Sequence, residues 1–307
     1  MSEIEFVRDL AFEYGIADQV TPMIRRVVAQ NPSPFTFYGT GTYIIGHGEV
    51  AVIDPGPLID THIDALLNAV AGEQVTHILI THTHKDHSPA AAPFKAATGA
   101  PTYGFGPHMP GNYWKNIGYS GPLSGDLDFA PDYSLKDGDV IYGDGWSIET
   151  IHTPGHIANH LCFGLKEENC LFSGDQVMGW STTVVAPPEG DMFDYMRSCE
   201  RLLDRHEEIF WPTHGPPILT PHEYLQALVK HRLNRENEIF QMLSNGVIRI
   251  SEIVSVLYKH SPTHLHGAAA KTILSHLVNM IQTGRVMCEG RPTLKSKFRV
   301  SETTVKK

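Results

Sequence analysis

Short apolar runs that end in turn residues mark out strands in the first two thirds of the chain. The runs 42–45 and 50–53 flank the turn-forming stretch 46–49, a pattern that predicts a β-hairpin ending at Asp54-Pro55-Gly56. Three later runs of strand length also end in glycine, proline or other turn residues, and they lie at 146–151, 170–172 and 209–211.

One helix separates the first hairpin from the next strand. Within 60–70, four apolar residues recur at helical spacing and line one face, while His62 and Asp64 lie elsewhere on the helix. The apolar run 75–80 follows and predicts a strand. Strands that alternate with helices in this way predict an α/β fold.

The last third of the chain has a helical pattern followed by a basic hairpin. Thr220-Pro221-His222-Glu223 has the form of a capping box with proline at the first helical position, which predicts a helix to Leu243. Further helices are expected over 251–258 and 268–282, and a hairpin over 284–300. Three helices and a hairpin in this order predict a small winged-helix domain.

The charge of the chain is divided unequally between two predicted domains, residues 1–219 and 220–307. The formal net charge is −10, made up of −17 in the first domain and +7 in the second. An acidic domain holds divalent cations well, whereas a basic one attracts nucleic acid, an acidic partner or its own acidic neighbour. The stretch 271–280 holds the place of a recognition helix but carries one lysine, so packing or dimerisation is as good an interpretation as DNA binding.

Length and composition place the chain among globular proteins. Its 307 residues, 41% of them hydrophobic, are enough for a sizeable core. Charges interrupt residues 1–20, which therefore lack the apolar centre of a secretory signal, and no apolar stretch reaches membrane-spanning length. The four cysteines form no CxxC pair and lie in apolar surroundings, which favours reduced thiols. We therefore expect a cytoplasmic protein with no membrane partner.

Three imidazoles and a carboxylate follow directly behind the predicted strand that ends at residue 80, in the sequence His-Thr-His-Lys-Asp-His. Alternate residues of a strand point to one side, so His82 and His84 can point together, and Asp86 and His87 then face a second position. Neutral imidazoles and ionised carboxylates suit zinc, manganese or iron. A catalytic metal is the leading hypothesis, and a histidine-rich surface loop is the alternative.

Three later segments place further metal-binding groups at predicted strand ends: Thr153-Pro154-Gly155-His156, Ser173-Gly174-Asp175 and Pro212-Thr213-His214-Gly215. With this order of motifs, residues 36–219 resemble the metallo-β-lactamase superfamily. The resemblance implies an αββα four-layer sandwich, two mixed sheets face to face with helices outside. The last third is similar to the winged-helix domain of the β-lactamase-like protein 2 group, which the pairs His231-Arg232 and Arg235-Glu236 fit.

The resemblance also implies a centre of two divalent ions, with three ligands on each ion and one bridging carboxylate. The first ion would be held by His82, His84 and His156, and the second by Asp86, His87 and His214. The bridging carboxylate would be Asp175. Zinc is expected, with manganese or iron as alternatives. Two cations that share a water lower its pKa toward neutrality, and Asp86 would be the catalytic residue that orients the resulting bridging hydroxide.

A hydrolase that attacks an ester-like bond of a small molecule, whether a lactone, thioester, β-lactam or phosphoester, is the favoured function. The β-lactamase-like protein 2 group includes a single-strand endoribonuclease, so RNA cleavage is the first alternative. The acidic first domain, which shows no basic stripe beside the ligand motifs, argues against it. A nucleic-acid-binding regulator with a non-catalytic metal site is the second alternative. The substrate, the metal and the oligomeric state stay open, with a homodimer as one option.

Four further residues are candidates for substrate contact. His160 lies four residues after His156, and orienting a metal ligand or capping a turn are its other interpretations. Trp180 lies in an uncharged stretch behind Asp175, where core packing competes. Tyr113 and Trp114 belong to a long irregular segment and suit a nucleobase or a hydrophobic acyl group.

Overall fold

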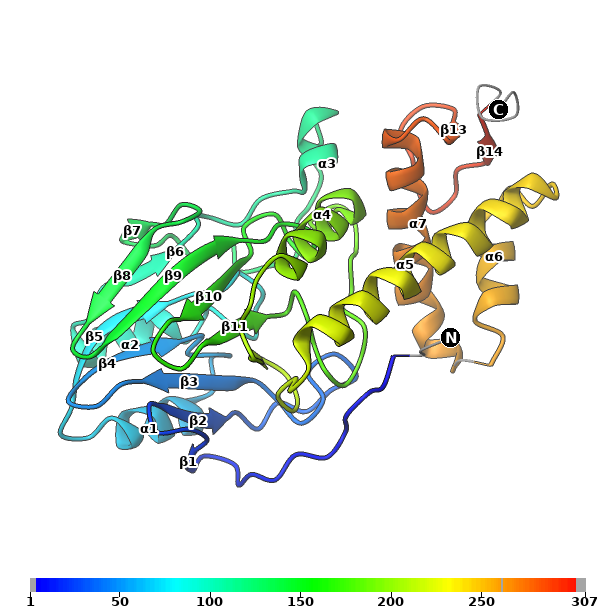
Figure 1. Ribbon diagram of the computed structural model, residues 1–307. Helices are drawn as coiled ribbons and strands as arrows, with labels where there is room; N and C mark the ends of the chain where they lie inside the picture. Colours follow the sequence, from blue (N-terminus) through cyan, green and yellow to red (C-terminus); the bar gives the residue numbers. More distant parts are fainter. Residues whose placement is uncertain (1–3, 261, 302–307) are drawn as a thin grey trace.

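Two β-sheets lie face to face in the computed structural model, which describes residues 4–260 and 262–301 (Figure 1). The ends of the two predicted domains, at positions 1 and 307, lie outside the described residues. Within the described ranges the first sheet has seven strands in chain order, β1 to β7: Ala17–Gln19, Ile24–Val28, Gly41–Ile45, Glu49–Ile53, Gln74–Leu79, Thr102–Gly104 and Tyr133–Ser134. The second sheet has the order β12-β11-β10-β9-β8, that is Ile209–Pro212, Cys170–Gly174, Leu161–Leu165, Trp146–His152 and Val140–Gly143.

Helices cover the outer faces of both sheets (Figure 1). Helices α1 (Asp60–Ala69) and α2 (Ala91–Thr98) pack on the first sheet, and α4 (Met192–Leu203) packs on the second. The long helix α5 (Pro221–Ser244) lies against α4 and joins the same apolar cluster. The predicted αββα sandwich is therefore confirmed.

Alternation along the central strands distributes the apolar side chains between the layers. In β4, Ala51 and Ile53 point into the core between the sheets, whereas Val50 and Val52 point toward α1 and α2. In β10 of the second sheet, Phe163 points into the core between the sheets and Cys162 points toward α4. Strands buried on both faces are continuously apolar, so the polar groups of these segments are confined to the strand ends.

The last third of the chain has the predicted order of elements. Helix α5 is followed by α6 (Ile250–Leu257), α7 (His266–Gln282) and an antiparallel hairpin of β13 (Val286–Cys288) and β14 (Phe298–Val300). The predicted capping box at the start of α5 is wrong, because the Thr220 side chain makes no cap hydrogen bond; proline alone marks this helix start. The boundary between residues 219 and 220 stays a prediction, since α5 packs in the cores of both domains.

Helix α7, at the place of a recognition helix, is largely buried. It packs against α4, α5 and α6, and eight of its side chains are buried, from Ala269 to Met280. The interpretation that this helix serves packing is therefore favoured over groove binding. None of the helices within residues 4–260 and 262–301 combines the length and the apolar character needed to cross a membrane. All four cysteines are free thiols, as expected, and the cytoplasmic location stays a prediction.

Candidate metal centre

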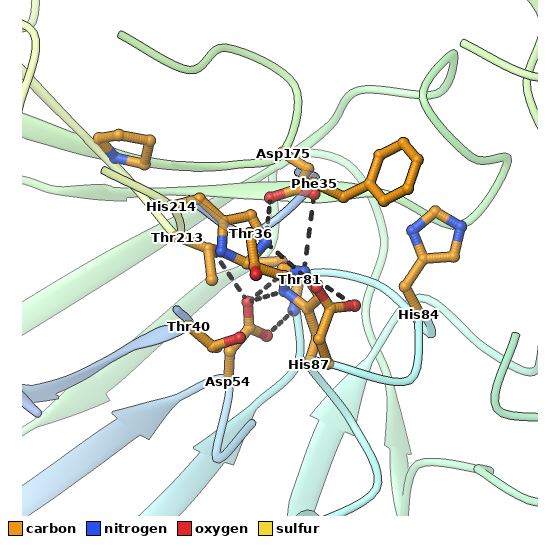
Figure 2. Close-up of polar contacts among 12 residues, drawn as sticks. Phe35, Thr36, Thr40, Asp54, Thr81, His84, His87, Asp175, Thr213 and His214 are labelled. Carbon is orange, nitrogen blue, oxygen red and sulfur yellow. Dashed lines mark hydrogen bonds and ion pairs between the residues drawn. The ribbon is translucent and has the colours of Figure 1, made fainter. Parts of the chain in front are cut away.

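The metal-binding motifs meet because five strands end at the same edge of the sandwich. Strand β4 runs parallel to β5, and β11 runs parallel to β12, so the residues that follow these strands share an edge. Strand β9 is antiparallel to β10, which is antiparallel to β11, so β9 ends at this edge too. Figure 2 shows the result: Asp54, His87, Asp175 and His214 from four distant segments point toward one another.

Three imidazoles form the first half of the centre. The Nδ1 atom of His84 lies 2.9 Å from the Nε2 atom of His82 and 2.9 Å from the Nε2 atom of His156. Burial, followed by the charge of the neighbouring His156, lowers the pKa of His84 to about 3. Burial likewise holds the pKa of His82 well below its usual value. Burial also lowers the pKa of His156, so all three rings are kept neutral, the form that binds a metal ion.

The second half combines two imidazoles with a carboxylate. The Nε2 atom of His214 lies 3.2 Å from Oδ2 of Asp86, and the Nε2 atom of His87 lies 3.7 Å from Oδ1 of Asp86. Burial opposes a charge on His214, but the carboxylates of Asp175 and Asp86 outweigh it and raise its pKa. Negative charge therefore exceeds positive charge at this point, which is the electrostatic condition for holding a cation.

Asp175 lies between the two halves. Its Oδ2 atom is 3.6 Å from Nε2 of His156 and 3.7 Å from Nε2 of His87, and its Oδ1 atom is 3.4 Å from Nε2 of His214. One carboxylate therefore faces ligands of both halves. The ligand atoms of His82, His87 and Asp175 also lie within 4.8 Å of one another, as do those of each half.

In His156 and His214, hydrogen bonds on the far side of the ring fix which nitrogen faces the centre. The Nδ1 atom of His156 lies 2.6 Å from the carbonyl oxygen of Val184, and Nδ1 of His214 lies 3.1 Å from that of Gly39. A carbonyl can only accept, so each Nδ1 carries the proton and each Nε2 directs its lone pair inward.

Buried atoms without partners provide the test of whether this residue set fits metal ions. The Nε2 atoms of His87 and His214 and the Oδ1 atom of Asp175 are buried and make no hydrogen bond in the structure. Acceptors buried without a donor are costly, and cations at this point would satisfy all three. The residues therefore fit a pair of divalent ions.

Asp54 is a functional residue that the sequence analysis missed. Its Oδ2 atom lies 2.8 Å from Nδ1 of His87 and also accepts hydrogen bonds from the hydroxyls of Thr81 and Thr213, while Oδ1 accepts from the Thr81 backbone N–H (Figure 2). The carboxylate is fully buried. It therefore holds the proton of His87 on Nδ1 and leaves Nε2 free to bind. Its position at the end of the first hairpin, in Asp-Pro-Gly, was the only signal in the sequence.

His160 supports a ligand and does not reach the substrate side. Its ring is fully buried, Nδ1 lies 2.8 Å from the Thr153 hydroxyl, and Nε2 accepts the backbone N–H of Asp175 at 3.1 Å. Of the interpretations left open for this residue, the orienting role agrees with these contacts.

A cavity of about 200 Å³ opens beside the metal centre. It is lined by residues of the centre, by apolar side chains and by residues from distant parts of the chain: His84, Asp86, His156, Asp175, Phe35, Met178, Val184, Ala186, Ser124, Glu189 and Lys271. The cavity is therefore the place where a substrate can approach the ions.

Three residues expected to contact substrate lie elsewhere. Trp114 is 4% exposed and packs in the apolar core of the C-terminal domain, with Tyr113 at its edge. Trp180 stacks on Phe37, with ring centroids 4.8 Å apart, and is not among the residues that line the cavity. Tyr113 and Trp114 instead join the irregular segment of the first domain to the second domain.

Comparison with known proteins agrees with this geometry. Residues 36–214 match the Metallo-beta-lactamase superfamily, and residues 250–293 match the Beta-lactamase associated winged helix domain. An atrochrysone carboxyl ACP thioesterase of Aspergillus chevalieri is 30% identical over 271 residues, which cover 85% of this chain and 81% of the relative. A beta-lactamase-like protein 2 homolog of Caenorhabditis elegans is 29% identical over 280 residues, which cover 88% of each chain.

Solved structures show the same fold. The crystal structure of a beta-lactamase domain protein from Burkholderia ambifaria has a TM-score of 0.78 and covers 95% of this chain and 96% of its own, at 18% identity. A metallo-beta-lactamase family protein from Thermus thermophilus has a TM-score of 0.69 at 21% identity and covers 92% of this chain and 99% of its own. This chain therefore belongs to the metallo-β-lactamase superfamily, as a metal-dependent hydrolase whose sandwich is followed by a β-lactamase-associated winged helix.

Proposed function

We propose that this chain hydrolyses a thioester or a related ester-type bond of a small molecule, at two divalent ions bound by the seven residues of the metal centre. His82, His84 and His156 would hold one ion, Asp86, His87 and His214 the other, and Asp175 both. The single observation that carries the proposal is the set of buried atoms at the metal centre that have no hydrogen-bond partner, with a cavity that opens beside them. When bound, such ions supply Lewis acidity and a water of lowered pKa, and zinc suits this nitrogen-rich ligand set.

Asp86 has the position of the residue that orients the attacking water. It lines the cavity, and its pKa is lowered because the imidazoles of His87 and His214 outweigh the effect of burial. An ionised carboxylate accepts a hydrogen bond from the water and so directs the oxygen of the water at the scissile carbonyl.

The leaving group is the reason for placing thioesters first. Burial opposes ionisation of Glu189, but the neighbouring His108, with Nε2 3.5 Å from Oε1, and the hydrogen bonds from Ser124 lower its pKa to about 2, so neither Glu189 nor Asp86 offers a proton. A thiolate leaves without a proton, because thiols ionise near pH ~8.5, whereas an alkoxide or an amine anion needs one. The thioesterase name of the Aspergillus chevalieri relative agrees with this order.

RNA cleavage is the second candidate, and the basic C-terminal domain is the observation that favours it. Against it, two carboxylates of the centre and Glu189 line the cavity, and α7 is buried against three other helices. Both features disfavour a polyanion that must pass along a surface.

A substrate panel tests the proposal. Zinc-loaded and manganese-loaded protein is offered a thioester, a lactone, a β-lactam, a phosphotriester and single-stranded RNA, and the metal-free protein is the control. We expect metal-dependent turnover, with the highest kcat/KM on the thioester. A preference for RNA, or equal rates without metal, would contradict it.

A further inference from the structure

A lysine from the second domain faces the cavity of the first. Lys271 belongs to the second turn of α7 and lines the cavity together with His84, Asp86, His156 and Asp175. The helix is fixed on either side of this lysine, because Ala269 and Ile273 are buried. Nothing in the predicted winged-helix pattern indicated that α7 would contribute to the catalytic cavity.

The charge of Lys271 is unpaired among the residues that the structure describes. Its side chain is exposed and has no carboxylate within ion-pair distance over residues 4–260 and 262–301. Glu189, the lining acid outside the metal centre, has its own donors: Oε1 accepts from the backbone N–H and the hydroxyl of Ser124 at 2.6 and 2.9 Å. With ions on the ligand carboxylates, Lys271 offers the cavity a positive charge that no protein group neutralises.

The cavity also has an apolar wall. Phe35, Met178, Val184 and Ala186 line the cavity, and Phe35 is 53% exposed on the side of His84 (Figure 2). A large aromatic side chain this exposed beside a catalytic cavity gives an apolar part of a substrate something to pack on. The cavity thus combines an apolar surface, the metal centre and one cation.

We propose that Lys271 binds an anionic group of the substrate, a carboxylate or a phosphate, and holds it while the ester or thioester bond lies at the metal centre. The winged-helix domain is then a wall of the active site that selects substrates by charge. This inference rests on the proposed function, and it names the substrate class: an anionic acyl thioester, or an acyl thioester of a phosphorylated thiol. A fixed ammonium group recognises either anion, because both accept charge-assisted hydrogen bonds.

Two pairs of probes separate the sources of the anion. Succinyl- and butyryl-N-acetylcysteamine differ in a carboxylate on the acyl side, and the acetyl thioesters of phosphopantetheine and pantetheine differ in a phosphate on the thiol side. Each is hydrolysed by zinc-loaded wild-type protein, Lys271→Met and Lys271→Arg. The matched control is Lys259→Met, which removes an exposed lysine of the same domain away from the cavity.

For at least one pair, we expect Lys271→Met to lower kcat/KM on the anionic member by about 10-fold, a typical loss for one charge-assisted contact, and to leave the neutral member within twofold. Lys271→Arg should retain most of the preference, and Lys259→Met all of it. Equal effects of Lys271→Met on both members of both pairs, or no effect, would overturn the inference while the proposed function stands.

A binding measurement keeps the inference testable without turnover. Calorimetric titration of zinc-loaded protein with succinate and butyrate compares ligands that share one carboxylate for the ions and differ in the second. Wild-type protein should bind succinate more tightly, and Lys271→Met should remove the difference. Equal affinities of wild-type protein for succinate and butyrate would overturn the proposal that Lys271 binds a carboxylate. If Lys271→Met impairs only the cleavage of single-stranded RNA, the choice of a small substrate is overturned. If no thioester is hydrolysed, the proposed function fails, whatever the titration gives.

Discussion

Replacing Asp54 by asparagine tests the support of the metal centre, because it changes one buried atom and keeps the shape of the side chain. The Oδ2 position meets three groups: the ring of His87 and the hydroxyls of Thr81 and Thr213. With an amide nitrogen there, both hydroxyls can rotate and accept. The imidazole can accept only if its proton moves from Nδ1 to Nε2, which removes the lone pair that a metal ion needs.

The alternative is a flipped amide, and its cost sets the magnitude. In that orientation the amide nitrogen faces the backbone N–H of Thr81, which Oδ1 accepts at 2.8 Å in wild-type protein, so a buried donor is left unpaired. An unpaired buried donor costs about 1–3 kcal/mol, and a factor of ten in affinity corresponds to about 1.4 kcal/mol. We therefore expect Asp54→Asn to bind zinc about 10- to 100-fold more weakly, the usual effect of losing a partner behind a metal ligand.

Competition between metal-free protein and a fluorescent zinc chelator measures the affinity. Asp144→Asn makes the same chemical change at an exposed position and should bind zinc as wild-type protein does. Circular dichroism verifies that Asp54→Asn is folded. Zinc affinity within twofold of wild type at both sites would refute the role given to Asp54.

Three further predictions follow from other parts of the structure. Asp86→Ala and Asp175→Ala should each lose most metal-dependent turnover while thermal unfolding still shows a folded chain; wild-type rates in the metal-loaded variants would sink the ligand assignment. Arg232→Met removes the hydrogen bond from α5 to the Thr183 carbonyl, next to the carbonyl that holds His156, and should weaken zinc binding by about 3- to 10-fold with Arg232→Lys in between, as chelator competition would show. His62 is buried, which lowers its pKa to about 4, so the unfolded chain takes up a proton below pH ~6.5 and stability is lost as pH falls. Between about pH 7.5 and pH 5 His62→Gln should lose about 2 kcal/mol less unfolding free energy than wild type in urea titrations, and identical losses would contradict this.

Local patterns explain why the strands and the metal ligands could be predicted from the sequence. Each ligand follows a strand within eight residues, so the ends of the apolar runs located the ligands without knowledge of the rest of the fold. His82 and His84 do lie together, but in the loop after β5, which ends at Leu79, and not within the strand. The structure places all seven predicted ligands at one edge, and their assignment to two ions stays a proposal until metal is bound.

Long-range contacts explain what could not be predicted. Asp54 and His87 are 33 residues apart, and only the parallel pairing of β4 with β5 brings them together. Because the two domains pack against each other, Lys271 of the second domain lines the cavity, and Trp114 of the first domain packs in the core of the second. An aromatic loop and a lone lysine carry no spacing signal for such packing, so the sequence could not predict that Tyr113 and Trp114 pack with the C-terminal domain or that Lys271 lines the cavity.

The central claim is that two ions at one centre carry out the hydrolysis, and titration of the metal-free protein with zinc tests it most directly. Thioester hydrolysis and bound zinc are measured at each addition, at a protein concentration well above the dissociation constants. The account predicts no turnover without metal and a rate that reaches its maximum at two ions per chain. Hydrolysis by the metal-free protein, or a full rate with only one zinc ion bound per chain, would contradict it.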